Sequence, residues 1–431
     1  MPTTSRRAVL TGLGVLTPVG TDPDSFFNRL LDGVSGVAPI TMFDASPLAC
    51  RIAGQMADFD AKKFLPASAK DARKSLKVMA RTVQMGVCAS QKAMDDAGLQ
   101  KGSVAPHRFG IEFGCVMVAS DVDDFALAGS QSINRETMQV DFAAWGGEKG
   151  IGNITPLWML KYLPNMPACH TSIFFDAQGP NNTITTSEVA GLLALGEAYR
   201  LMARNRADFF LVGGTESKVN SVSYPRHDLF SILTKRNDDP AGAVRPFDKT
   251  RDGTVQCEAA CTFGLEEYEH ARKRNARIYA ELVGFASGFD RGMKGTTFAH
   301  VIRHAMKEAG IGCDDVDHVN AAAGGWPEYD AWEARAIAEV FGTAVPVFAP
   351  KGHFGNAGAA GGLVELAASA LALHRGQLPG TKNYSTADPR CPVAVHSGSP
   401  RPVTKPYVLK TGFTDRGQCT AVVIRKFDPN P

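Results

Sequence analysis

The chain has 431 residues, of which 44% are hydrophobic, and its formal net charge is +2 at pH 7. This length exceeds one ordinary domain, so we expect two core units or one large one. The small net charge gives no reason to expect nucleic-acid binding, and no run reaches the roughly 18 apolar residues of a membrane span. Nine cysteines without CxxC pairs or metal-ligand spacing predict reduced, mostly buried thiols in a cytoplasmic protein and no metal site.

Strand-like and helix-like segments alternate along the chain. The first, Ala8 to Gly20, follows two arginines, but glycines and a proline interrupt its apolar run, so it fits a strand and turn better than a leader peptide. The clearest later segments are strands over 209–212 and 318–320 and helices over 79–97, 191–202 and 359–373. This alternation predicts an α/β fold with largely parallel sheets.

The segment Gly179 to Gly191, which we call the elbow, has the pattern of a short strand, a tight turn and the start of a helix. It belongs to a series of motifs that also includes Ala8 to Gly20, Leu30 to Ile40, Val212 to Glu216, Arg245 to Gly253 and Glu266 to Leu282. In this order and at these intervals, the series resembles the β-ketoacyl-acyl-carrier-protein synthases, or ketosynthases. The resemblance covers nearly the whole chain.

The resemblance implies a thiolase-like α/β fold of two pseudo-repeated halves, with helices and sheets layered α-β-α-β-α. We place the boundary near residue 255, so the halves are expected over 1–255 and 256–431. The first half would contain the elbow. It would also contain the segment 122–164, which in the family forms a cap and part of the dimer surface. No cofactor is implied.

The nucleophile of the family is replaced in this chain. In ketosynthases the elbow carries a cysteine four residues after an isoleucine, but here Ile184 is followed at that spacing by Glu188. A carboxylate is a weak nucleophile towards thioesters and would form an unstable anhydride. Glu188 is therefore expected to be either a helix-capping acid in a retired site, or a mimic of an acylated or carboxylated intermediate, or a general base.

Both catalytic histidines that the resemblance implies are also replaced. The first belongs to an Asn-Ala-His-Gly-Thr motif, and here Ala322 falls in the histidine position of the run that begins at Asn320. The second follows a Lys-x-x-x-Gly pattern, and its position holds Asn356. An asparagine side chain donates hydrogen bonds but does not titrate. His353, three residues earlier, is either a substitute that contacts substrate or a structural histidine.

Other polar and glycine positions of the family's active site are kept. Lys351 and Glu333 match two positions that ketosynthases keep near the site, where such residues form structural lysine–glutamate pairs or the polar floor of the pocket. Gly412 and Phe413 survive from the Gly-rich turn that gates the acyl tunnel and contributes to the oxyanion hole, so they are expected to contact substrate. The next two residues are Thr414 and Asp415 instead of glycines, which predicts a rebuilt gate.

The resemblance places the protein in fatty-acid or polyketide assembly, as a homodimer or as a heterodimer with a cysteine-bearing ketosynthase, and with an acyl carrier protein as partner. Three hypotheses follow. The first is a non-condensing subunit similar to chain-length factors, although those commonly have glutamine where Glu188 stands. The second is an enzyme whose altered acyl-thioester chemistry, by decarboxylation, acyl transfer or hydrolysis, centres on Glu188. The third is a homodimeric acyl-binding scaffold.

Overall fold

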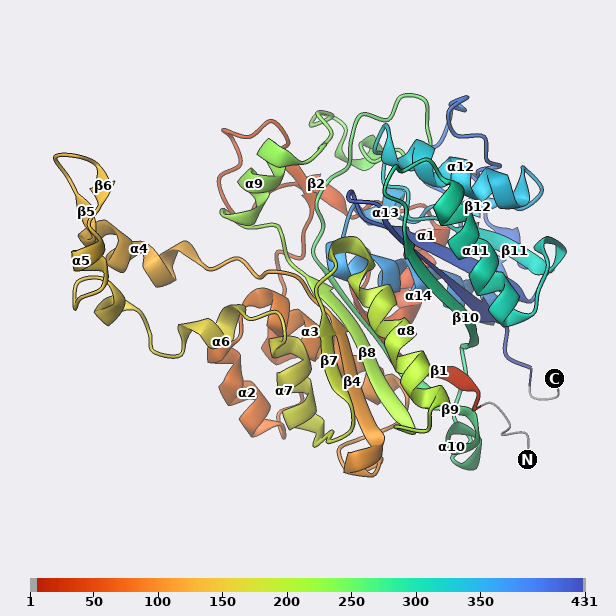
Figure 1. Cartoon of the computed structure of the whole chain (residues 1–431), viewed down its shortest axis with the longest axis horizontal. Helices are drawn as coiled ribbons and strands as arrows, with labels where there is room; N and C mark the ends of the chain where they lie inside the picture. Colours follow the sequence, from red (N-terminus) through yellow and green to blue (C-terminus); the bar gives the residue numbers. More distant parts are fainter. Residues whose placement is uncertain (1–5, 429–431) are drawn as a thin grey trace.

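The computed structural model describes residues 6–428. Ten strands form one hydrogen-bonded sheet in the order β12-β11-β15-β16-β10-β1-β9-β8-β4-β7 (Figure 1). The strands of the N-terminal part are β1 (Ala8–Leu16), β4 (Phe109–Gly114), β7 (Asn181–Ile184), β8 (Phe209–Glu216) and β9 (Ala259–Glu267). Those of the C-terminal part are β10 (Ala280–Phe289), β11 (Val316–Asn320), β12 (Val347–Phe348), β15 (Tyr407–Phe413) and β16 (Gln418–Arg425).

The two parts of the sheet repeat one topology. Read outward from the centre, the first runs β1, β9, β8, β4, β7 and the second runs β10, β16, β15, β11, β12. In each, the first two pairings are antiparallel and the last two are parallel. The halves join where β1 pairs antiparallel with β10 over three residue pairs. This confirms the predicted pseudo-repeat, although the sheet is mixed and not largely parallel.

The repeat also moves the expected boundary between the halves. Strand β9 lies between β1 and β8 and is the fifth strand of the first half, although it begins after residue 255. The boundary therefore falls between β9 and β10, because the first half of the sheet is complete only when β9 has paired between β1 and β8. The outer ends of the predicted halves, Met1 and Pro431, lie outside the described residues.

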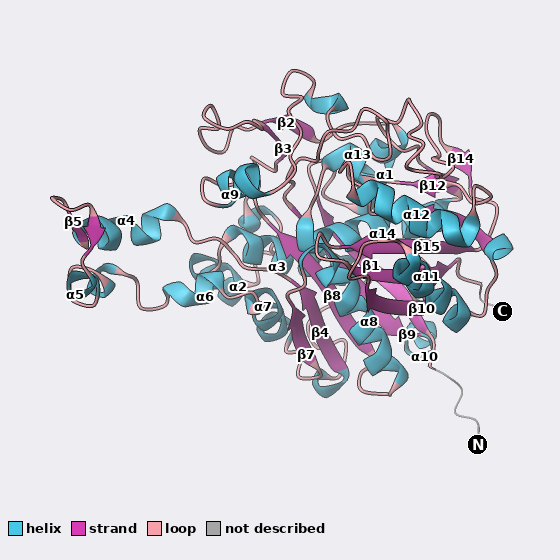
Figure 2. Cartoon of the chain, turned by 45° about the horizontal axis from the view of Figure 1, so that its top comes forward, coloured by secondary structure: helices cyan, strands magenta, loops and turns pink. Residues whose placement is uncertain are grey.

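Helices form three layers around the two halves of the sheet. Helices α8 (Ala190–Ala203) and α14 (Gly361–Arg375) pack against each other and against strands of both halves, so they form the central layer. Helices α3 (Arg81–Asp96) and α7 (Met166–Phe175) cover the outer face of the first half, and α11 (Thr296–Ala309) with α12 (Tyr329–Phe341) covers the second. Helix α14 is buried from Gly361 to Leu373, as an all-round apolar helix must be. The layers α-β-α-β-α match the predicted architecture, and the five predicted segments are confirmed by β8, β11, α3, α8 and α14 (Figures 1 and 2).

Smaller elements connect or flank these layers. They are α1 (Pro23–Leu31), β2 (Val37–Pro39), β3 (Ile52–Gly54), α2 (Lys70–Ser75), α9 (Ser223–Phe230), α10 (Tyr268–Lys273), α13 (Lys351–Phe354), β13 (Gln377–Leu378) and β14 (Arg401–Pro402). All nine cysteines are free and seven of them are buried. Between residues 6 and 428, no helix combines the length and the apolar character that crossing a membrane requires.

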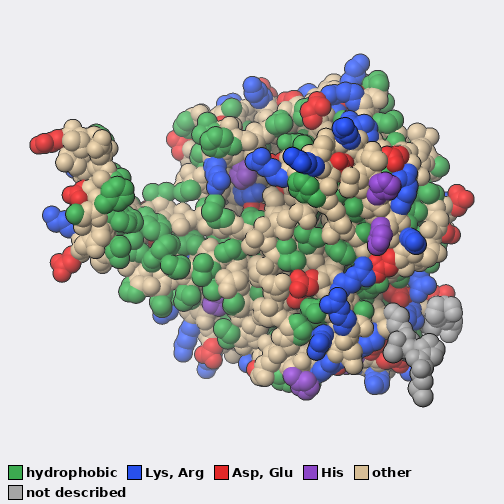
Figure 3. Space-filling model, viewed as in Figure 1, with side chains coloured by type: hydrophobic (Ala, Val, Ile, Leu, Met, Phe, Trp, Pro, Cys, Tyr) green, Lys and Arg blue, Asp and Glu red, His purple; other side chains and the backbone are tan. Residues whose placement is uncertain are grey.

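Residues 119–165, which we call the arm, extend away from the layered body (Figures 1 and 2). The arm contains α4 (Val122–Gln131), β5 (Ile133–Asn134), β6 (Gln139–Val140), α5 (Phe142–Trp145) and α6 (Trp158–Tyr162). Its surface carries exposed large apolar side chains, among them Val122, Leu127, Met138, Val140, Phe142, Ile151, Leu157 and Met159. Figure 3 shows hydrophobic side chains gathered along it. Contiguous exposed apolar surface of this kind marks an interaction site.

Candidate functional site

The elbow has the predicted geometry of strand, turn and helix start. Strand β7 ends at Ile184, a short 3₁₀ turn spans Ser187–Val189, and α8 begins at Ala190. Ser187 has a φ of +50°, in the left-handed region that side chains other than glycine seldom adopt. Backbone strain of this kind is concentrated at functional sites. The strained turn places Ser187 and Glu188 side by side on the wall of a cavity.

This cavity has a volume of about 140 Å³, close to that of the engineered cavity of about 150 Å³ that binds benzene in another protein. Three of the predicted site residues line it: Glu188, Asn356 and Phe413. Lys218 and Gln256 line it as well, but neither was predicted from the sequence. Lys218 follows the carboxyl end of β8 by two residues, which is the one sequence signal that could have located it.

Glu188 is held as a carboxylate next to Asn356. The Asn356 side-chain nitrogen Nδ2 donates a hydrogen bond to Glu188 Oε1 at 3.3 Å. Burial has the largest single effect and raises the pKa of Glu188, but the positive charge of Lys218 and the hydrogen bonds to the carboxylate together outweigh it, so the pKa lies below its usual value. The Lys218 ammonium is 3.1 Å from Glu216 Oε1 at the end of β8. The turn before α8 therefore holds an acid whose environment favours the ionised form.

Ala322 lies above a buried polar floor, which we define as Asn320, Glu333, Lys351, Glu365 and Lys410. Its backbone N–H donates to Glu333 Oε1 at 2.8 Å, and its carbonyl accepts from Lys351 Nζ at 2.9 Å. The Ala322 methyl group can replace none of the hydrogen bonds of an imidazole. Ala322 therefore contacts the polar floor through its backbone N–H and carbonyl groups.

The partners within the polar floor differ from the expected ones. Lys351 pairs with Glu365, not with Glu333, and Lys410 pairs with the other oxygen of the same carboxylate. Glu333 instead accepts from the backbone of Ala322 and from Thr411 Oγ1. Sequence analysis missed Lys410 and Glu365, although a single charged residue inside an apolar strand and an apolar helix is a usable signal. Neither Glu333 nor Lys351 lines the cavity.

Two residues expected to bind substrate serve the packing of the fold. His353 is buried, with Nδ1 3.2 Å from the Val34 carbonyl oxygen and Nε2 3.1 Å from that of Gly380, and it does not line the cavity. A Cβ at Gly412 would approach Leu192 Cδ1 to 2.8 Å, so this glycine allows β15 to pack closely on α8. Of the three residues predicted to contact substrate, only Phe413 lines the cavity, and the contacts of His353 fit the alternative of a structural histidine.

Trp326 lines the cavity and belongs to the loop of residues 321–328, which we call the wall loop. The Asp330 carboxylate accepts from the backbone N–H groups of Gly324, Gly325 and Trp326 at 3.0–3.1 Å. Arg251 donates to the Pro327 carbonyl at 2.7 Å and to Asp388 at 2.6 Å.

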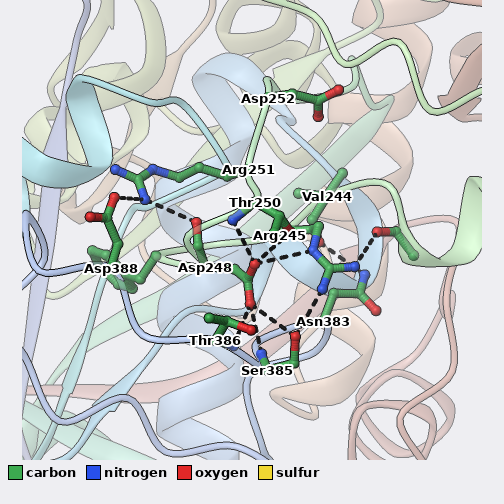
Figure 4. A network of polar contacts seen from close by, with 12 residues as sticks. Val244, Arg245, Asp248, Thr250, Arg251, Asp252, Asn383, Ser385, Thr386 and Asp388 are labelled. Carbon is green, nitrogen blue, oxygen red and sulfur yellow. Dashed lines mark hydrogen bonds and ion pairs between the residues drawn. The ribbon is translucent and has the colours of Figure 1, made fainter.

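The same Arg251 also donates to the Asp248 carbonyl at 2.9 Å, while the Asp248 carboxylate accepts from the backbone N–H groups of Ser385 and Thr386 (Figure 4). The motif 245–253 thereby ties the wall loop to the segment 383–388. The anchored loop presents the Trp326 ring to Phe413, at 5.9 Å between ring centroids. The motif's role is to fix one aromatic wall of the cavity.

The strain at Ser187 predicts a specific response to substitution. Ser187→Gly is expected to change the free energy of unfolding by less than about 1 kcal/mol, because glycine adopts a positive φ without a steric penalty. Ser187→Val is expected to lower it by about 2 kcal/mol, because a β-branched side chain is strained there. Urea denaturation followed by circular dichroism measures both. Equal stability of the two variants would contradict the strained turn.

Glu333 predicts a pH-dependent stability. Burial raises its pKa to about 7, so the folded protein holds a proton that the unfolded chain releases near pH 4.3. The stabilisation that this bound proton gives to the folded state is fully present below the unfolded-state pKa and is lost as pH rises through about 7. Between pH 5 and pH 8 the free energy of unfolding of the wild type should fall by roughly 3 kcal/mol relative to that of Glu333→Gln, whose side chain stays neutral. Urea denaturation at four pH values tests this, and parallel stability curves would refute it.

Comparison with known proteins agrees with this fold. The family model described as Beta-ketoacyl synthase, N-terminal domain matches residues 5–271, and the C-terminal domain model matches residues 279–385. The 3-oxoacyl-[acyl-carrier-protein] synthase 2 of Synechocystis sp. is 33% identical over 433 residues, which cover 98% of both chains. The granaticin polyketide putative beta-ketoacyl synthase 1 of Streptomyces violaceoruber is 33% identical over 434 residues, or 98% of this chain and 99% of the relative.

Solved structures show the same architecture. A beta-ketoacyl synthase from Burkholderia phymatum superposes with a TM-score of 0.86 at 27% identity, covering 98% of this chain and 100% of the other. The ishigamide ketosynthase/chain length factor gives a TM-score of 0.84 at 26% identity, covering 99% and 100%. The order of the two domains and the layered fold agree with these relatives, and the chain belongs to the β-ketoacyl synthase family of fatty-acid and polyketide biosynthesis.

Proposed function

We propose that this chain is a non-condensing ketosynthase-like subunit, similar to a chain-length factor, that works beside a cysteine-bearing ketosynthase on acyl-carrier-protein substrates. The observation that carries the proposal is the Glu188–Asn356 hydrogen bond at the place of the nucleophile. Condensation in this family requires a thiolate that accepts the acyl group and two imidazoles that polarise the extender thioester. Glu188, Asn356 and Ala322 can supply none of these groups.

The proposed partner would bind at the edge of the sheet and along the arm. Strand β7 is the outermost strand, and its Asn181 and Asn182 are exposed. An edge strand offers unpaired backbone groups to a second chain, and the arm adds exposed apolar surface. Because the elbow follows β7 directly, a partner at this edge would lie next to the cavity. The solved ishigamide ketosynthase/chain length factor supports such a pairing by analogy.

The function is tested by producing the chain with and without a cysteine-bearing ketosynthase and an acyl carrier protein. The pair is expected to purify as a heterodimer and to elongate the acyl group, whereas this chain alone should release neither carbon dioxide nor free carrier from malonyl- or acyl-carrier protein. Intact mass spectrometry follows both products. Glu269→Gln, which changes an exposed carboxylate on α10, is the control for effects on folding.

A second candidate function rests on the ionised state of Glu188 and on its Oε2 atom, which has no hydrogen-bond partner in the part of the chain that the structure describes. Such a carboxylate is free to act as a base in decarboxylation, acyl transfer or hydrolysis. Turnover by the chain alone that disappears in Glu188→Gln but persists in Glu269→Gln would establish this function and refute the first. A stable homodimer that retains acyl groups without turnover would instead indicate a scaffold.

A further inference from the structure

The cavity beside Glu188 offers hydrogen-bond acceptors that lack donors. Glu188 Oε2 and Gln256 Oε1 are both buried, and no group within residues 6–428 donates a hydrogen bond to either. Gln256 is only 2% exposed, and both residues line the cavity. A buried acceptor without a donor is destabilising, because its lost hydration is not replaced. A ligand with several N–H donors would satisfy both atoms.

The charged groups that face the cavity leave it negative. They are Glu188, Asp415, Lys218 and the imidazole of His227. The ammonium of Lys218 already pairs with Glu216, and burial lowers the pKa of His227 to about 4, so this ring is neutral at pH 7. Burial and the nearby charge of Glu188 raise the pKa of Asp415, which shows that the two carboxyl groups repel each other. The start of α8 offsets part of the charge of Glu188, and Asp415 has only the exposed Arg416 as an ion-pair partner, with Nε 3.7 Å from Oδ1.

Aromatic rings form the rest of the wall. Trp326 and Phe413 pack edge to face at 5.9 Å, and Tyr329 lies 6.3 Å from each of them. All three line the cavity. Rings arranged beside carboxylates attract cations through their π faces, and their apolar surface accommodates methylene groups. Acceptors, negative charge and aromatic faces together suit an ammonium group attached to a short carbon chain.

We propose that this cavity binds the protonated amine of a small aminoacyl group that is presented as a carrier thioester, with the ammonium placed between Glu188 Oε2 and Gln256 Oε1. The proposal rests on the proposed function in one respect, which is that the ligand arrives as an acyl thioester. The volume of about 140 Å³ limits the group to a few carbon atoms. A neighbouring cavity of about 510 Å³ shares Lys218, His227, Phe230, Ser231 and Asp415 with it and has room for the thioester arm.

The test compares two thioesters of nearly equal shape. β-Alanyl-pantetheine ends in an ammonium group, and butyryl-pantetheine ends in a methyl group at the same place. Isothermal titration of the purified full chain at pH 7 is expected to show at least about tenfold tighter binding of the β-alanyl compound. Glu188→Gln and Gln256→Met should each reduce this ratio towards one, while Glu269→Gln should leave it unchanged.

Equal or tighter binding of butyryl-pantetheine to the wild-type chain would overturn the proposal, and so would an unchanged ratio in Glu188→Gln. Because binding is measured without turnover or a partner chain, its failure is distinct from that of the proposed function. A chain that pairs with a ketosynthase but shows no amine preference refutes only the ligand class. If the chain prefers the amine but turns over substrate without a partner subunit, only the proposed non-condensing role is refuted.

Discussion

Replacing Glu365 with glutamine is expected to lower the free energy of unfolding by about 3–5 kcal/mol, because two buried ammonium groups would lose their shared counter-charge. Lys351 and Lys410 are at most 3% exposed, and each approaches a different oxygen of Glu365. A glutamine would offer one carbonyl oxygen without charge and would point an N–H₂ group at the other lysine. Urea denaturation at pH 7, followed by circular dichroism, measures the loss.

Two further variants make this experiment decisive. Lys410→Met should be less harmful than Glu365→Gln, since Glu365 would keep Lys351 as its partner. Glu269→Gln should change stability by less than about 1 kcal/mol, because its partner Arg272 is exposed. If Glu365→Gln were no more destabilising than Glu269→Gln, the polar floor would not be held together by its charges.

The double variant Met138→Asp/Phe142→Asp is expected to weaken association with the partner subunit about 100-fold. These side chains are 75% and 81% exposed on the arm, and burying one large apolar side chain in an interface contributes about 1.5–3 kcal/mol. Sedimentation velocity at several concentrations measures the change in the dissociation constant.

The control for the arm is Glu136→Gln, which alters an exposed residue of the same segment without removing apolar surface. It should associate as the wild type does. Unchanged association of the double variant, with its circular dichroism spectrum intact, would exclude the arm from the interface. The partner would then have to bind through β7 and its neighbours alone.

Much of the fold could be predicted because it is encoded locally. We predicted β8, β11, α3, α8 and α14 from apolar runs and helical periodicity, and both patterns depend on residues that are close together in the sequence. The same holds for the placement of Glu188 at the start of a helix. The repeat boundary could not be found in this way, because β9 returns to the centre of a sheet whose other strands lie far away in the sequence.

The composition of the site shows the same division. Glu188 and Asn356 were identified from aligned motifs, and their hydrogen bond joins residues 168 positions apart. Lys218, Gln256 and Lys410 carry no motif, and they reach the cavity or its floor only through packing between the two halves. The pairing of Lys351 with Glu365 instead of Glu333 depends on side-chain geometry across α14, which spacing along the chain does not determine.

Because the two halves repeat one strand order, equivalent turns of both halves contribute residues to the cavity. Glu188 lies in the turn between β7 and α8, and Asn356 lies between β12 and α14, which are the equivalent strand and helix of the second half. The cavity thus lies between the two halves, and each half contributes its equivalent turn. Neither unit holds a complete site, so two fragments split between β9 and β10 would have to reassemble before anything could bind.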